Sequence, residues 1–115
     1  MTNETINYFG HILFRIVAVK SFKDVKYGDF GGFIEKEKNL SHDGDSWIYD
    51  DSKVYGNAEV KGNACIRTGS CVYDNAKVYE NATVRFGSEV YGNACIHGNA
   101  IISSNADFCY GTVKT

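Results

Sequence analysis

Residues 54–66 read VYGNAEVKGNACI, and within them a large apolar residue recurs at every sixth position. The spacing extends in both directions, so that eleven of eleven positions taken at this interval from Ile48 to Phe108 are large and apolar. The residue four places after each anchor is small, through Thr112, and glycine or asparagine often stands between them. A fixed period of this kind indicates stacked structural repeats.

A period of six fits neither an α-helix nor a simple β-meander. It fits a repeat in which each hexad forms one short strand and one tight corner, with the anchor pointing inward and its neighbours outward. Glycine or asparagine at the corner is expected to take the left-handed backbone conformation. Three hexads close an 18-residue triangular coil. We therefore predict an all-β fold, a left-handed parallel β-helix of about 3.7 coils over residues 46–115.

Residues 1–45 do not follow the repeat. Residues 11–19 predict a strand that is apolar on both faces and hence buried, and a second apolar cluster surrounds a glycine-rich turn at residues 28–32. The ends of a solenoid expose unpaired strand edges, which need a cover. We expect residues 1–45 to form a β-hairpin-like cap, so that the chain is one structural domain.

The sequence also resembles a known family. The motifs are Gly31-Gly32-Phe33, the segment GDSWIYD at residues 44–50, and the recurring Val-Tyr-Gly-Asn-Ala hexads. From about residue 15 to 110 the chain is similar to bacterial and phage hexapeptide-repeat proteins that are usually labelled acyltransferases. The resemblance implies a left-handed β-helix, frequent oligomerisation, and frequent carriage by phages or prophages. Characterised acyltransferases of this type tend to have longer prisms, an extruded loop, and a catalytic histidine in a cleft between trimer subunits.

Residues 18 positions apart should stack on the outside of the prism. On one face this spacing predicts a ladder of Tyr55, Tyr73 and Tyr91, with side chains close enough to stack. Tyrosine offers a large contact area at a small entropy cost, which favours a partner-binding or oligomer-forming surface. Tyrosine also simply fills exposed strand positions well, so both interpretations stay open.

The second face carries Trp47, Tyr49, Arg67 and Arg85. Two stacked arginines next to aromatic residues predict an anion-binding or nucleotide-binding site, at the boundary between two subunits. The alternatives are that the arginines are merely solvated and that Trp47 packs against the cap.

Of the three histidines, His11, His42 and His97, only His97 lies in the repeat. It is the candidate for a catalytic base, although an exposed histidine without a role is the simpler reading, and the repeat has no extruded loop. The spacing predicts neither a metal site nor a cofactor site. The four cysteines occupy outward positions that are too far apart to form disulfides, which is typical of a reducing compartment.

The formal net charge of −2 gives no basic field for nucleic acid or an anionic membrane. No segment approaches the roughly 20 apolar residues of a membrane span, and the first residues lack a signal-peptide pattern. We therefore expect a cytoplasmic protein, in the host cytoplasm if a phage encodes it.

Our leading hypothesis from the sequence is a non-enzymatic binding protein, a homodimer or homotrimer, that presents the tyrosine ladder to another protein. The resemblance to phage proteins makes an inhibitor of a host defence protein a concrete version. Two alternatives remain: a sponge that sequesters a small nucleotide signal with Arg67, Arg85 and the aromatic residues, and a trimeric acyltransferase that uses His97 and acyl-CoA.

Overall fold

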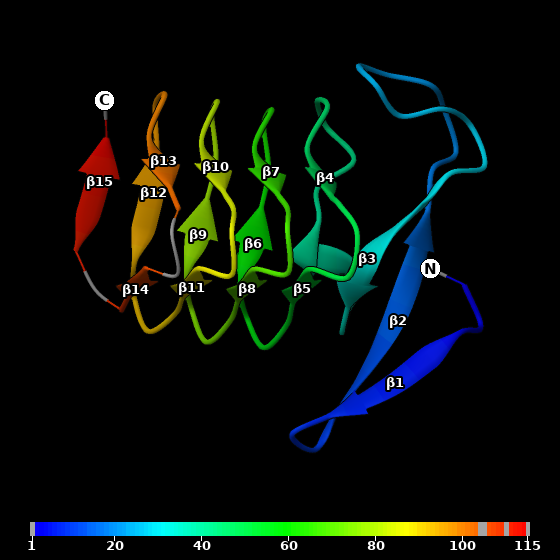
Figure 1. Cartoon of the computed structure of the whole chain (residues 1–115), viewed down its shortest axis with the longest axis horizontal. Coiled ribbons are helices and arrows are strands. Elements are labelled where there is room, and N and C mark those ends of the chain that lie inside the picture. Colours follow the sequence, from blue (N-terminus) through cyan, green and yellow to red (C-terminus); the bar gives the residue numbers. More distant parts are fainter. Residues whose placement is uncertain (1, 104–105, 110, 115) are drawn as a thin grey trace.

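The protein is a three-sided solenoid of parallel β-strands with an N-terminal cap, as Figure 1 shows. The computed structural model describes residues 2–103, 106–109 and 111–114. In these residues the fold is all-β apart from one 3₁₀-helix, η1 (Glu37–Asn39). The predicted fold class, a left-handed parallel β-helix, is confirmed. No helix among the described residues is long and apolar enough to cross a membrane.

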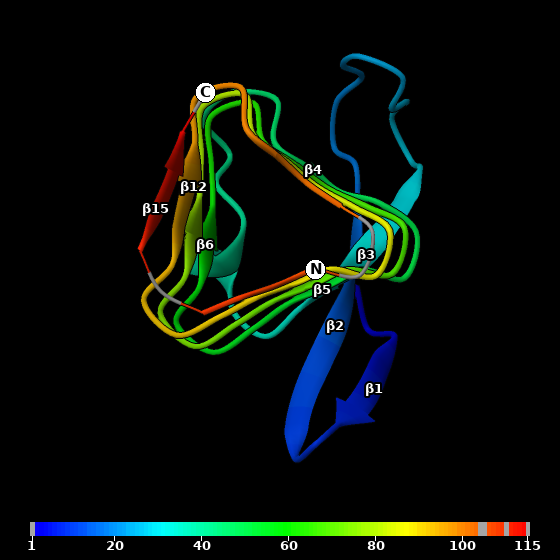
Figure 2. The same ribbon diagram turned by 60° about the vertical axis from the view of Figure 1, so that its left-hand side comes forward.

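Four coils stack along one axis, and each contributes one short strand to each side of the prism (Figure 2). The first side contains β4 (Trp47–Ile48), β7 (Cys65–Ile66), β10 (Thr83–Val84) and β13 (Ile101–Ile102). The second, called the tyrosine face below, contains β5 (Lys53–Val54), β8 (Cys71–Val72), β11 (Glu89–Val90) and β14 (Asp107–Phe108). The third contains β6 (Glu59–Val60), β9 (Lys77–Val78), β12 (Cys95–His97) and β15 (Thr112–Lys114).

The anchors of the hexads form the core of the prism. Val54 pairs with Val72, and Val72 pairs with Val90, so that positions 18 apart lie in register. All three valines have 0% exposed surface. The small residues that follow the anchors are also buried from Ser52 to Ala100, since only short side chains fit where the chain turns inward. The predicted vertical stack of interior side chains is confirmed.

The corners differ from the prediction in one respect. From Ile48 to Ile96 the left-handed backbone conformation belongs to the second residue after each anchor, as at Gly56, and not to the asparagine that follows it. Among the residues of the coils that the structure describes, five non-glycine residues adopt it: Asp50, Thr68, Asp74, Glu80 and Phe86. The corner asparagines instead donate backbone N–H groups to the next coil, as Asn57 does to the Asp74 carbonyl at 2.8 Å.

The last coil is one residue shorter than the others. In β15, Val113 pairs with Ile96 and Thr112 pairs with Cys95, a separation of 17 residues in place of 18. Thr112 was predicted as the small inward residue of this hexad, but it lies on an outward strand position and is exposed. Gly111 takes the place of the small residue, since its carbonyl accepts the N–H of Cys95 at 2.9 Å, as the Ala94 carbonyl accepts the N–H of Lys77 in the coil before.

The cap extends the tyrosine face beyond the first coil. Strands β1 (Thr5–Tyr8) and β2 (His11–Val17) form an antiparallel hairpin, β3 (Phe30–Ile34) pairs antiparallel with β2, and β3 then runs parallel to β5. The result is one seven-stranded sheet in the order β1-β2-β3-β5-β8-β11-β14. The hairpin-like cap therefore closes the prism by adding strands to one of its sides.

A glycine in β3 lets the cap pack closely against the first coil. A Cβ added at Gly31 would lie 2.6 Å from the Ile48 carbonyl oxygen, so only glycine lets β3 approach the first coil this closely.

In β2, Leu13 and Ile16 are buried, but Ile12 is 47% exposed. The prediction that residues 11–19 are buried on both faces holds for Leu13 and Ile16, which pack in two different clusters, but it is wrong for Ile12 and for Val19, which is 71% exposed. Ile12 lies in the part of the hairpin that projects past the prism.

Candidate binding groove on the tyrosine face

The three tyrosines predicted to stack do form a ladder. The ring centroids of Tyr55 and Tyr73 are 5.0 Å apart with an interplanar angle of 6°, and those of Tyr73 and Tyr91 are 5.1 Å apart at 5°. The rings follow directly after β5, β8 and β11, whose register sets the spacing. Because each ring face inside the ladder covers its neighbour, the ladder presents mainly ring edges and hydroxyl groups to solvent.

The hairpin covers the first rung of the ladder. Tyr8 makes an edge-to-face contact with Tyr55 at 5.8 Å between ring centroids, and the His11 ring lies 4.9 Å from the same tyrosine. Tyr55 is consequently only 8% exposed and packs in a cluster with Leu13 and Phe33. The hairpin therefore covers most of the surface that Tyr55 was expected to offer to a partner. Tyr73 and Tyr91 remain partly exposed.

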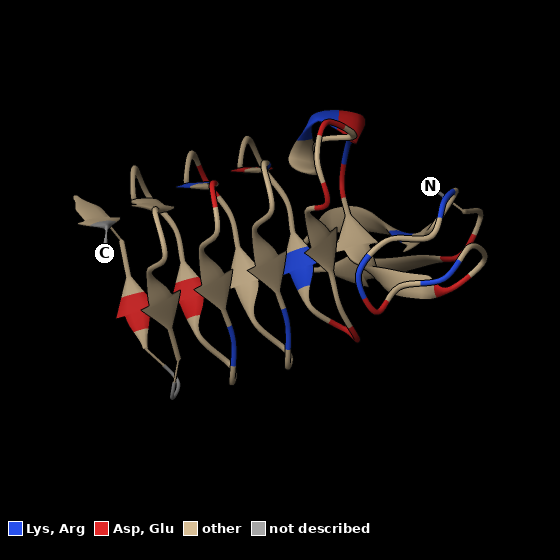
Figure 3. Ribbon diagram, turned by 90° about the horizontal axis from the view of Figure 1, so that it is seen from above, with Lys and Arg blue, Asp and Glu red and all other residues tan. Residues whose placement is uncertain are grey.

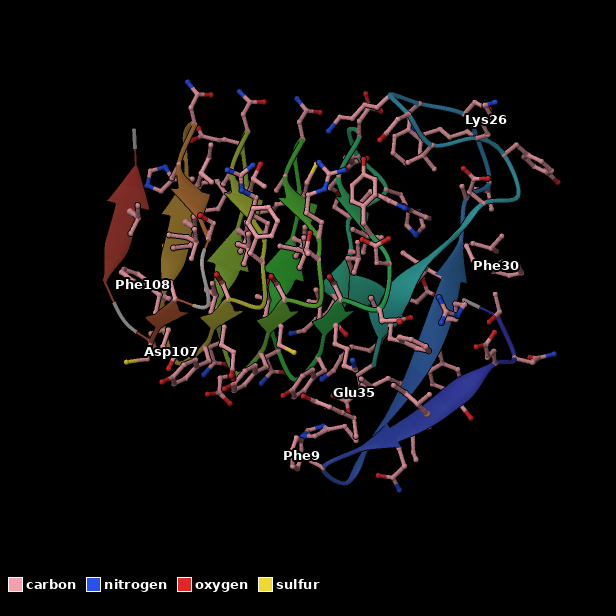
Figure 4. All side chains as sticks on the ribbon, in the orientation of Figure 1. Phe9, Lys26, Phe30, Glu35, Asp107 and Phe108 are labelled. Carbon is pink, nitrogen blue, oxygen red and sulfur yellow. The ribbon has the colours of Figure 1, made fainter. Side chains whose placement is uncertain are left out.

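Between the hairpin tip and the ladder lies a groove of about 520 Å³. Its most exposed wall is Phe9, which is 84% exposed and stands at the tip of the hairpin, on the side of the molecule where the tyrosine face lies (Figure 4). The lining residues are Tyr8, Phe9, His11, Tyr55, Tyr73, Asp74 and Glu89. The groove therefore combines the aromatic rings of the ladder, the aromatic residues of the hairpin tip and two carboxylates.

The carboxylates are held by short hydrogen bonds. The Tyr73 hydroxyl donates to Glu89 Oε1 at 2.8 Å, and the Gly92 N–H donates to Asp74 Oδ2 at 3.1 Å. Partial burial, together with the hydrogen bond to Glu89 and the charge of Glu89, raises the pKa of Tyr73 above its ordinary value.

Charge is unevenly distributed along the tyrosine face. Lys53 lies on the strand nearest the cap, whereas Glu89 and Asp107 lie on strands farther from it (Figure 3).

A histidine–glutamate pair fixes the hairpin above the groove. His11 Nδ1 lies 3.0 Å from Glu35 Oε2, and Glu35 Oε1 accepts the Gly56 N–H at 2.9 Å. Burial alone would raise the pKa of Glu35, but the hydrogen bonds from His11 and Gly56 outweigh it and hold the pKa below its usual value. The pair links β2, the end of β3 and the Gly56 corner of the first coil.

Sequence reasoning missed the residues of the hairpin. Tyr8, Phe9 and His11 lie more than 40 positions from Tyr55, and no periodicity connects them with the ladder. Glu89 was within reach of the sequence, because the 18-residue spacing places it on the tyrosine face. Only the fold-back of the hairpin reveals that Glu89 and Asp74 line a concave site.

The side of the prism formed by β4, β7, β10 and β13 does not assemble the predicted anion site in full. Trp47 is 6% exposed and packs edge-on against Phe22, so it belongs to the junction with the cap. The Arg67 guanidinium lies 4.2 Å from the Tyr49 ring centroid and 3.9 Å from Asp24 Oδ2. Asp24 also accepts the Tyr49 hydroxyl at 2.8 Å. The cap therefore supplies a carboxylate where a bound anion was expected.

Arg85 lies beyond this cluster, with its guanidinium 5.0 Å from the Phe86 ring centroid. Its Nε is buried without a hydrogen-bond partner among the described residues. Neither Trp47 nor Tyr49 is free to complete a nucleotide site around Arg85.

His97 has the carboxylate neighbour that a catalytic base requires. Its Nδ1 lies 3.1 Å from Glu80 Oε1, and its ring stacks on Tyr79 with centroids 4.8 Å apart. The side chain is 15% exposed. An Nδ1–H group that donates to Glu80 would leave Nε2 able to accept a proton. This arrangement lies on the third side of the prism, away from the groove.

All four cysteines are free thiols. Cys71 points away from the prism but is only 7% exposed, because the hairpin lies over it and the Tyr8 hydroxyl is 3.8 Å from its Sγ. Burial raises the pKa of this thiol. Among the described residues, no group of three or more histidine, cysteine or acidic side chains could hold a metal ion.

A smaller cavity of about 190 Å³ lies at the junction of the cap and the first coil. Ile16, Ala18, Leu40 and Trp47 line it, and all four are buried. Its lining also includes five polar or charged residues, Lys20, Glu37, Ser41, His42 and Ser46. The groove on the tyrosine face combines a preorganised aromatic ladder with two carboxylates, which makes it the better candidate for specific recognition.

Comparison with known proteins adds a limited similarity. No protein-family model matches the chain. The chain is similar to the uncharacterized acetyltransferase YdcK of Escherichia coli K12, with 44% identity over 39 residues. The match spans 34% of this chain and 12% of YdcK, so it covers a small part of that protein. Together with the solenoid, this similarity fits a hexapeptide-repeat protein.

Proposed function

We propose that the protein is a non-enzymatic binding protein that docks a partner protein in the groove between Phe9 and the tyrosine ladder. The observation that supports this most directly is Phe9. A phenylalanine that is 84% exposed at a hairpin tip adds nothing to the core, yet it forms one wall of the groove. Exposed aromatic residues beside a concave surface are typical of protein-binding sites.

The groove also has the composition of a contact surface. Aromatic rings provide apolar area, and the Tyr73 hydroxyl and two carboxylates provide directional polar contacts. The ladder is preorganised by its own stacking, so binding would order few additional side chains. The resemblance to phage proteins suggests a host defence protein as the partner. The four free cysteines support a cytoplasmic location.

Phe9→Asn tests this function without risk to the fold. The backbone at Phe9 has φ of 50°, a conformation that asparagine tolerates well, and the side chain is not part of the core. Phe86→Asn is the matched control, because Phe86 is 50% exposed at φ of 57° on another corner of the molecule. We expect immobilised wild type and Phe86→Asn to capture the same protein from the native host, and Phe9→Asn to lose it.

Tyr73→Asp should abolish capture of the same protein. Tyr79→Asp, on the third side of the prism, is its control, and thermal unfolding of both variants checks that they are folded. The mass of the intact assembly, measured for all variants, distinguishes a foreign partner from a second copy of the chain. If wild type and both groove variants capture the same set of proteins and have the same mass, the proposal is wrong.

A second candidate function is acyl transfer, which the pairing of His97 with Glu80 and the similarity to YdcK favour. In this reaction His97 Nε2 would take a proton from an acceptor hydroxyl as that oxygen attacks the thioester carbonyl of an acyl-CoA. The coenzyme A thiolate would leave and take up the proton. Release of free thiol from acetyl-CoA, lost in His97→Gln, would support this function. Wild-type protein with no acetyl-CoA turnover and no thermal shift would exclude it for the acetyl donor.

A further inference from the structure

We propose that the groove recognises a positively charged side chain, arginine in preference to lysine, on an extended segment of the partner protein. This inference rests on the proposed function and names the chemistry of the partner. It follows from three features of the groove: its carboxylates, the position of its nearest cations, and the surfaces that the aromatic rings leave uncovered.

Each groove carboxylate engages the protein through one oxygen. Glu89 accepts the Tyr73 hydroxyl with Oε1, and Asp74 accepts the Gly92 N–H with Oδ2. A carboxylate has about four lone-pair sites, so both groups keep acceptor capacity after these bonds are made. Asp74 is exposed and Glu89 is exposed, so a ligand can reach them. A guanidinium group is the donor that best matches such acceptors.

The cations near the groove are already engaged elsewhere. Lys53 Nζ lies 4.9 Å from the Tyr8 ring centroid and donates to the Asp51 carbonyl at 3.0 Å. His11 is paired with Glu35 at 3.0 Å. Neither compensates Asp74 or Glu89. Asp107 adds a further negative charge on the next strand of the same face. The groove therefore has a negative potential that attracts cations and repels anionic ligands.

The aromatic surfaces suit the stem of a long basic side chain. The tyrosine rings are about 5 Å apart, which leaves no room for a planar group between them. Their edges and the exposed face of Phe9 remain available. The methylene groups of arginine can lie along these edges while the guanidinium reaches the carboxylates, and Phe9 can contact the cation itself. Arg15 over Phe33, at 4.3 Å, shows the same pairing within the cap.

A matched pair of peptides tests this inference. The probes are acetyl-Ala-Arg-Ala-Arg-Ala-amide and the same peptide with citrulline in place of arginine, which removes the charge and keeps the shape. We expect the arginine peptide to shift the aromatic NMR resonances of Phe9 and Tyr73, with binding that weakens as salt is added. The citrulline peptide should bind about tenfold more weakly or not at all.

Asp74→Asn and Glu89→Gln should each weaken binding of the arginine peptide by about three- to tenfold, because each removes one charge and keeps the hydrogen bond to its protein donor. Glu59→Gln, on the third side of the prism, is the matched control and should have no effect. Three results would overturn the inference. The two peptides could bind equally well, neither peptide could bind, or Glu59→Gln could weaken binding of the arginine peptide as much as the groove variants do. In each of these cases the partner-docking function still stands if Phe9→Asn loses the captured protein.

Discussion

At the scale of single residues, several corners of the coils hold a non-glycine residue in the strained left-handed backbone conformation. Asp74 and Glu80 hold left-handed backbone conformations, and each accepts a backbone N–H from the residue 18 positions later, at 3.1 and 2.8 Å. These bonds offset the cost of a side chain in that conformation. Thr68 adopts φ of 59° with an exposed, β-branched side chain, for which the conformation is especially unfavourable.

We therefore expect Thr68→Gly to stabilise the protein by about 0.5–1 kcal/mol, since relief of the strain exceeds the added entropy of the unfolded chain. Glu80→Gly should not stabilise it, because the bond to Gly98 is lost. Urea unfolding of the two variants and the wild type measures both effects. A Thr68→Gly variant less stable than wild type would contradict this account.

At the scale of secondary-structure elements, the position of the hairpin depends on Glu35. This carboxylate joins His11 of β2 to the Gly56 corner of the first coil. Because these bonds lower the pKa of Glu35 below its ordinary value of 4.5, the ionised form stabilises the folded state. The contribution is complete above the ordinary pKa and is lost as the pH falls through the folded pKa.

Glu35→Gln should accordingly reduce the free energy of unfolding by about 1 kcal/mol at pH 7. The difference from wild type should narrow as the pH falls below about 4.5. Urea unfolding between pH 3 and pH 7 measures it, with Glu37→Gln as a control on the exposed part of the cap. A difference that stays constant over this range would show that the charge of Glu35 is not what stabilises the hairpin.

At the scale of the whole molecule, the cap and the prism share one continuous sheet. Ile16 and Ile34 of the cap join the core of the prism, and Leu13 packs in a second cluster with Phe33 and Tyr55. Leu13 in the hairpin and Ile96 in the third coil both have 0% exposed surface. Trp47 lies at the junction, packed against Phe22 of the cap. A chain of repeats can unfold in parts when the contacts between neighbours are weak, but a shared sheet joins these neighbours by backbone hydrogen bonds.

We expect Leu13→Ala and Ile96→Ala each to destabilise the protein by about 2–5 kcal/mol within a single unfolding transition. Trp47 fluorescence, which reports the junction, and far-UV circular dichroism, which reports the strands, should give coincident curves. If the fluorescence transition of Leu13→Ala came well before the circular dichroism transition, the cap and the prism would be separate folding units.

The prism and the spacing of its surfaces follow from the sequence alone. Each hexad contains its own anchor, small residue and corner, so the local pattern specifies the coil, and stacking at 18 residues then places Tyr73 between Tyr55 and Tyr91. Even the shortened last coil is visible in the sequence, since Val113 lies one position ahead of the six-residue register.

The groove was decided only by the tertiary structure. Its walls come from a hairpin whose contacts with the ladder span more than 40 residues, and the contact of Tyr8 with Tyr55 has no period that could be read from the chain. The same fold-back buries Tyr55 and Cys71, and the cap brings Asp24 to Arg67. The contacts between coils recur every 18 residues and can be predicted from the repeat. The contact between the cap and the prism occurs at one place, and it depends on the shapes and charges of the two surfaces there.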